Sequence, residues 1–127
     1  MRVKCNRLIS QTTLQELENS PWVTLDKKYL VLALVIGPRV GISIYINTEH
    51  YNEPGFFSIT GFEMISQNIP SSWTTVVENI NGDKVITMLP RSWNYETFFE
   101  EVEDGNLKAV ELFNHEAEKM YREEGLV

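Results

Sequence analysis

The sequence predicts an α+β fold, with an antiparallel β-meander of four to six strands between a short N-terminal helix and a C-terminal αα-hairpin packed on it. Apolar segments of strand length, separated by turn residues, fill the chain from residue 22 to 89. After residue 95 the apolar residues recur at helical spacing instead. A length of 127 residues and a 43% hydrophobic content suit one domain, spanning residues 1–127.

The N-terminal segment carries a helix signal. Thr13 and Glu16 have capping-box spacing, and Leu14 and Leu17 lie on one side of the helix that this spacing predicts. Ser20-Pro21 ends the segment, and residues 22–25 then form a candidate short strand.

The most apolar stretch, residues 29–47, is almost long enough to span a bilayer. Glycine, proline and arginine at positions 37–41 interrupt it, which indicates two strands, 29–36 and 42–47, joined by a turn. The first strand is apolar throughout, as in strands covered on both faces. The second alternates isoleucine with Ser43, Tyr45 and Asn47, which predicts one wetter face.

A loop containing Asn52, Pro54 and Gly55 precedes another apolar segment at residues 56–66. Residues 73–80 and 84–89 are expected to pair across Asn81-Gly82, because this dipeptide favours the tight turn of a β-hairpin.

The predicted αα-hairpin follows. Ser92 or Asn94 is expected to cap a helix that places Tyr95, Phe98, Phe99 and Val102 on one buried face. Gly105 should end it, and Asn106 or Asp104 should cap a second helix that ends at Gly125. The apolar positions of this second helix are Leu107, Val110, Phe113, Ala117, Met120 and Tyr121.

The charge is concentrated in the hairpin. Ten of the 18 acidic residues lie after position 95, with three of the 11 basic residues, so the net charge of −7 comes from this segment. Such a balance excludes sequence-independent nucleic-acid binding, which requires rows of Lys and Arg, and favours a basic partner.

The candidate catalytic and metal-binding groups are weak. His115-Glu116 resembles the start of a zinc-protease motif, but Lys119 stands where the second histidine belongs. Glu111, His115 and Glu118 would make a poor metal site, and His115 is expected to face solvent. Cys5 and His50 have no spacing that indicates a nucleophilic pair. We therefore expect a protein that is not an enzyme and has no cofactor or metal.

Four acidic residues just before Gly105 stand where negative charge is unfavourable, at the C-terminal end of a predicted helix. Glu100, Glu101, Glu103 and Asp104 fall in the last turns of the predicted first helix, where each exposed carboxylate costs roughly 0.3 to 1 kcal/mol. Stability given up on an exposed surface is typical of a functional site. The candidate partner-binding residues are Glu96, Glu100, Glu101, Glu103, Asp104, Glu111, Glu118 and Tyr51.

Residues 88–125 resemble the closing helices of immunity proteins from contact-dependent growth inhibition and related polymorphic toxin systems. The resemblance rests on Leu-Pro, a Trp, the Phe-Phe-Glu-Glu helix, Asp-Gly and a second helix bearing Ala, Phe and Glu. It implies a non-catalytic bacterial protein that binds and blocks one toxin domain.

The expected function is therefore neutralisation of a cognate toxin, a nuclease whose active site the acidic surface would occlude. A single cysteine and opening residues without a signal-peptide pattern favour the cytoplasm. We also expect a monomer or weak dimer that binds neither nucleic acid nor membranes. Two alternatives stay open. One is a small-molecule binding domain or minor enzyme with a pocket lined by Trp22, Trp73 and Phe62, and the other is an adaptor that dimerises.

Overall fold

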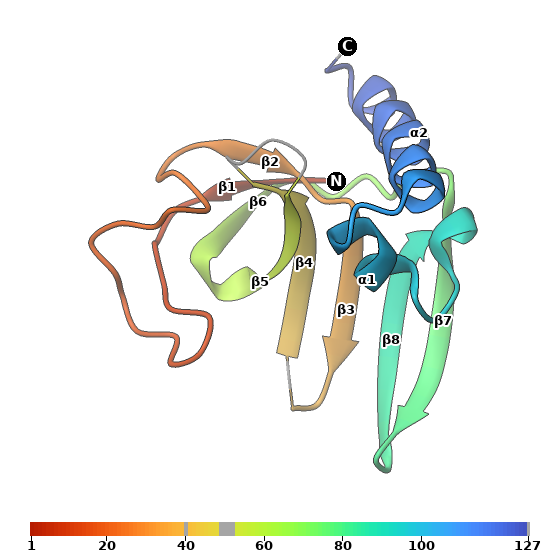
Figure 1. Cartoon of the computed structure of the whole chain (residues 1–127). Helices are drawn as coiled ribbons and strands as arrows, with labels where there is room; N and C mark the ends of the chain where they lie inside the picture. The colour runs from red at the N-terminus through yellow and green to blue at the C-terminus, as the bar shows by residue number, and fades with distance from the viewer. Residues whose placement is uncertain (40, 49–52, 127) are drawn as a thin grey trace.

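The structure, a computed structural model, describes residues 1–39, 41–48 and 53–126. These residues form two antiparallel sheets and two α-helices, arranged as Figure 1 shows. The small sheet has the order β2-β1-β6, from β1 (Arg2–Cys5), β2 (Lys28–Leu30) and β6 (Phe62–Ser66). The large sheet has the order β5-β4-β3-β8-β7, from β3 (Ala33–Gly37), β4 (Gly41–Asn47), β5 (Pro54–Ser58), β7 (Trp73–Ile80) and β8 (Asp83–Pro90).

The α+β class is confirmed, but the strands do not form one meander. Consecutive strands pair in β3-β4-β5 and in β7-β8, whereas the first two strands and β6 build a second sheet. The helices are α1 (Phe98–Glu103) and α2 (Leu107–Glu123), with 3₁₀ turns η1 (Ile59–Gly61) and η2 (Arg91–Trp93).

The apolar run predicted as one strand is divided between the two sheets. Its middle residues, Val31 and Leu32, are fully buried and belong to neither sheet. The Val31 N–H donates to the Met1 carbonyl at 3.0 Å, and the Leu32 N–H donates to the Tyr45 carbonyl at 2.8 Å. The run is apolar throughout because it passes from one sheet to the other through the interior.

Two hydrophobic cores lie on opposite faces of the large sheet. Ile44 and Ile46 of β4 pack with Val3 of the small sheet, whereas Tyr45 between them packs with the helices. The predicted wetter face of β4 is therefore wrong at Tyr45, because α1 and α2 cover it. The core under the helices contains Leu89, Trp93, Phe98, Val102, Phe113 and Met120.

The predicted N-terminal helix is wrong. The Ser10 hydroxyl accepts from the N–H groups of Thr12 and Thr13, both at 3.3 Å, and Leu14 takes a left-handed φ of 59°. Ile9 and Glu16 form an isolated antiparallel bridge instead of helical turns. A helix with two leucines as its apolar face has little to bury, and both are exposed here.

The predicted strand at residues 22–25 is also wrong. This segment leads into a turn at Asp26, whose φ is 68°. The turn is fixed to β1, because the Asp26 N–H donates to the Cys5 carbonyl at 2.7 Å and the Cys5 N–H donates to the Lys27 carbonyl at 2.9 Å.

The hairpin at Asn81-Gly82 is confirmed. Both residues have positive φ, 51° and 84°, as the expected tight turn requires, and Ile80 pairs with Asp83 on either side of it.

The αα-hairpin is confirmed with shifted boundaries. The first helix begins at Phe98 rather than after Ser92 or Asn94, because η2 occupies the preceding residues and leaves Tyr95 outside the helix and exposed. Gly105 has the expected left-handed φ of 77°. Asn106 caps α2 by accepting from the Ala109 N–H at 3.1 Å. Leu107, the first of the apolar positions named for this helix, is 81% exposed and does not belong to its buried face.

Candidate partner-binding site

The outer face of α1 carries a row of carboxylates. Glu100, Glu103 and Asp104 are spaced i, i+3 and i+4, all three are exposed, and Phe98 and Val102 are buried on the opposite face. These three acids, called the acidic stripe below, make no ion pair within the described part of the chain. Their charge is therefore available to a partner.

Residues 96 and 101 lie at the start of α1. Glu96 is exposed, whereas Glu101 is half-buried and its carboxylate accepts a hydrogen bond from the Thr97 hydroxyl. Because the helix begins at Phe98, Glu100 and Glu101 stand in its first turn, where negative charge is favourable. The prediction that four acids crowd the end of this helix is thus wrong for two of them, and Glu103 and Asp104 remain at that end.

The second helix contributes fewer free charges. Glu111 is exposed and has no ion pair among the described residues, while Glu118 Oε1 lies 2.6 Å from Arg122 Nη2. Glu116 is buried, only 7% exposed, with Oε2 3.6 Å from Lys119 Nζ. Of the predicted partner-binding residues, Glu100, Glu103 and Asp104 therefore lie together on one face of α1. Glu111 lies on the adjoining helix, and the charge of Glu118 is paired with that of Arg122. Tyr51 lies outside the described residues.

The groups considered for catalysis are not assembled in the described structure. His115 is exposed on α2, as expected. Across residues 1–39, 41–48 and 53–126, no three His, Cys, Asp or Glu side chains gather as metal ligands would. The Cys5 thiol is buried, which raises its pKa, and donates to the Arg7 carbonyl at 3.6 Å. His50 lies outside the described residues.

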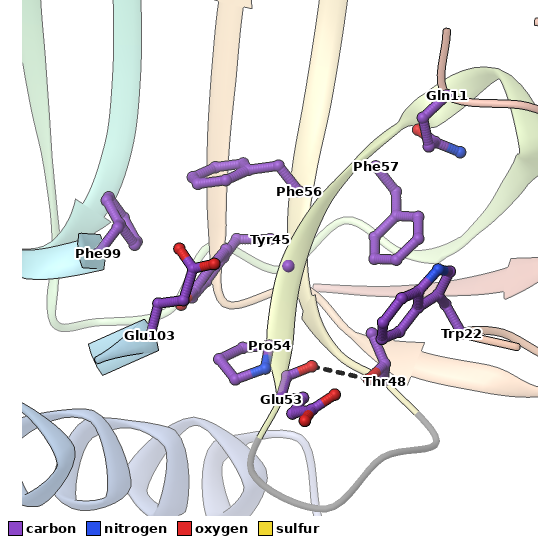
Figure 2. A pocket seen from close by; sticks show the side chains of 11 residues that line it. Gln11, Trp22, Tyr45, Thr48, Glu53, Pro54, Phe56, Phe57, Phe99 and Glu103 are labelled. Atoms are coloured by element: carbon purple, nitrogen blue, oxygen red, sulfur yellow. Dashed lines mark hydrogen bonds between the residues drawn. The ribbon is translucent and has the colours of Figure 1, made fainter. Parts of the chain in front are cut away.

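An open groove of about 610 Å³ runs along β5 next to the acidic stripe (Figure 2). We call it the β5 groove. Figure 2 shows Glu103 beside Tyr45 on one side of β5, with Trp22 and Phe57 on the other. The described residues that line it are Gln11, Trp22, Tyr45, Thr48, Glu53, Pro54, Gly55, Phe56, Phe57, Phe99 and Glu103.

Three aromatic rings from three elements form one wall of the β5 groove. The Tyr45 centroid lies 4.7 Å from that of Phe56 and 4.7 Å from that of Phe99, and the last two are 5.0 Å apart. Burial raises the pKa of the Tyr45 hydroxyl, and the nearby Glu103 charge raises it further. Tyr45 is therefore a neutral phenol over the ordinary pH range.

The free edge of β5 offers little for strand addition. The Ser58 N–H points away from β4 and donates to Gln11 Oε1 at 2.8 Å, and Pro54 has no N–H. Since alternate residues point outward along an edge strand, Phe56 is left as the outward-facing donor of this strand. Side chains, rather than backbone, dominate what this surface presents.

The predicted aromatic pocket is only partly reproduced. Trp22 lines the β5 groove, and it also lines, with Phe62, a smaller hollow of about 260 Å³. Trp73 is half-buried, and its Nε1–H points at the Met120 sulfur 3.3 Å away. Tyr45 and Phe99 were missing from the prediction, because their convergence depends on how α1 crosses β4.

Comparison with protein-family models, curated proteins and solved structures found no match to this chain. No helix in the described ranges is both long and apolar enough to cross a bilayer.

Proposed function

We propose that this protein is a cytoplasmic immunity protein that binds one cognate toxin domain and blocks its active site, without catalysis of its own. The observation that carries the proposal is the acidic stripe, three exposed carboxylates that make no ion pair with any described residue, together with the exposed Glu111 on α2. Both helices fall within residues 88–125, the segment that resembles immunity proteins of polymorphic toxin systems.

The proposed mechanism is electrostatic docking followed by occlusion. A negative surface attracts a basic partner over a distance of about one Debye length and raises its association rate. In a nuclease, Lys and Arg line the active-site groove to hold phosphates, and carboxylates bind the same side chains. A toxin with a basic active-site groove is therefore the partner that fits best.

The experiment is neutralisation in cells. Any toxin domain that the neighbouring reading frame encodes is expressed with the wild-type protein, with Glu100→Lys/Glu111→Lys, or with Glu18→Lys/Glu78→Lys, which alters the charge equally at exposed positions away from the helices. We expect the wild type and the Glu18/Glu78 variant to restore growth and copurify with the toxin, and the Glu100/Glu111 variant to lose both. Equal protection by all three would remove the acidic helices from the interface.

A second candidate function is small-molecule binding in the β5 groove. Its volume of about 610 Å³ and aromatic wall are typical of ligand sites. This function would be favoured if a neutral aromatic compound bound tightly in the groove and the protein neutralised no toxin.

A further inference from the structure

We infer that the β5 groove is a receptor for an arginine side chain of the partner protein. The inference rests on the proposed function, because it names the chemical group that a basic toxin surface would insert next to the acidic stripe.

The charge of the groove is one-sided. Among the described residues that line it are two carboxylates, Glu53 and Glu103, and no Lys, Arg or His. Neither carboxylate has an ion pair among the residues that the structure describes. Thr48 donates to the backbone carbonyl of Glu53 at 2.7 Å and fixes the chain at the mouth of the groove (Figure 2). The two carboxylates therefore favour a bound group that carries positive charge.

The aromatic wall selects the kind of cation. Phe56 is 40% exposed and packs on Tyr45 and Phe99, so a ring remains accessible in the groove that Glu103 also lines. A guanidinium stacks on aromatic faces and donates in a planar fork to carboxylates. It is also less strongly hydrated than an ammonium, so it enters a partly apolar groove at lower cost. These properties favour arginine over lysine.

The size of the groove favours an arginine carried on a protein segment. The volume of about 610 Å³ exceeds the space of one side chain, and it extends past Gly55 to the Trp22 and Phe57 side of β5. Residues flanking the arginine would occupy this second half. The acidic stripe continues from Glu103 to Glu100, so the same partner surface reaches both.

The test uses a peptide probe and amide NMR shifts of the whole chain. The probe is a capped Gly-Arg-Ala-Arg-Gly peptide, compared with versions that carry lysine or citrulline, which has the shape of arginine without its charge. We expect saturable shifts in β5 and α1 with the arginine peptide, binding weaker by about threefold with lysine, and no binding with citrulline.

Two variants locate the site. Glu103→Gln should weaken binding of the arginine peptide by about tenfold, as expected for loss of a close charge pair, and Phe56→Leu should weaken it by removing the stacking face. Glu78→Gln, at an exposed position of β7 outside the groove and the acidic stripe, should leave it unchanged. The inference falls if citrulline binds as well as arginine, if Glu103→Gln matches Glu78→Gln, or if about 10 mM peptide produces no saturable shift.

These outcomes separate the inference from the proposed function. Toxin neutralisation that depends on Glu100 and Glu111, without arginine-peptide binding in the groove, removes the inference alone. Arginine-peptide binding without neutralisation of any toxin removes the proposed function and leaves a receptor for basic segments.

Discussion

Tyr45 is the residue at which the fold and the candidate site meet. Its ring belongs to the core under the helices and also forms part of the wall of the β5 groove. From the sequence it was expected on a wetter face, because alternation along a strand shows which residues share a face but not which face an element elsewhere in the chain will cover.

Tyr45 gives a prediction about alkaline stability. Burial raises the pKa of its hydroxyl in the folded state, so folding favours the neutral phenol. That stability is complete below the unfolded pKa of about 10, and it is lost above that pH by up to about 1.4 kcal/mol per pH unit. In urea unfolding between pH 8 and 11, approximately, Tyr45→Phe should show a shallower decline than the wild type. Tyr121→Phe, at a half-buried ring of α2, is the control. Equal declines for the wild type and Tyr45→Phe would contradict this account.

Glu116 gives a second prediction, because it is a carboxylate buried among apolar residues. Lys119 Nζ lies 3.6 Å from its Oε2, and the Ser92 hydroxyl donates to its Oε1 at 3.4 Å. Lys119→Met leaves this carboxylate buried without its counter-ion and should lower the free energy of unfolding by about 1 kcal/mol. Lys108→Met, at an exposed position of the same helix, should change it little. Matching urea midpoints for the two variants would show that the pair contributes nothing.

At the scale of elements, the residue types in short segments predicted the turns and the cap of α2 correctly. They predicted an N-terminal helix that the chain does not form. Asn81-Gly82, Gly105 and Asn106 act as their residue types indicate, because positive φ and helix capping are decided within a few residues. The Thr13 to Glu16 pattern failed because a capping box specifies a helix end without supplying a face to bury, and the Ser10 hydroxyl takes the N–H groups of Thr12 and Thr13.

The start of α2 provides the test at this scale. Asn106→Ala removes the side-chain oxygen that accepts from the Ala109 N–H at 3.1 Å, so it should destabilise the protein by about 1 kcal/mol. Asn114→Ala removes an exposed asparagine in the middle of the same helix and serves as the matched control. Thermal unfolding that ranks Asn114→Ala as the more harmful change would contradict the assigned cap.

Across the whole molecule, the sheets and the net negative charge come from different parts of the chain. The strands and the two cores come mainly from the charge-balanced part before residue 95, and the acidic helices close one face of the large sheet. The spacing of apolar and turn residues predicted the α+β class, and the distribution of charge along the chain predicted the acidic segment. Neither could predict the second sheet, because the pairing of β1 with β6 joins residues about sixty positions apart, and no local pattern encodes that pairing.

Part of the candidate site could likewise be predicted from the sequence, and part of it depends on the fold. Glu100, Glu103 and Asp104 were predicted as contacts from charge alone, and helical spacing places them on one exposed face. The β5 groove was not predicted as it stands, because it combines Trp22, strands β4 and β5, and α1. Glu101 and Glu118 shared the charge signal but have partners in Thr97 and Arg122, which only coordinates reveal.

The association rate with the cognate toxin domain, measured by stopped flow as a function of salt, tests the central claim most directly. If the exposed carboxylates of α1 and α2 steer a basic partner, the wild-type rate should fall by tenfold or more between roughly 10 mM and 0.5 M NaCl. Glu100→Lys/Glu111→Lys should associate more slowly at low salt and with a much flatter dependence, while Glu18→Lys/Glu78→Lys should resemble the wild type. A wild-type rate that does not depend on salt, or equal rates for the two variants, would contradict the claim that these helices form the docking surface.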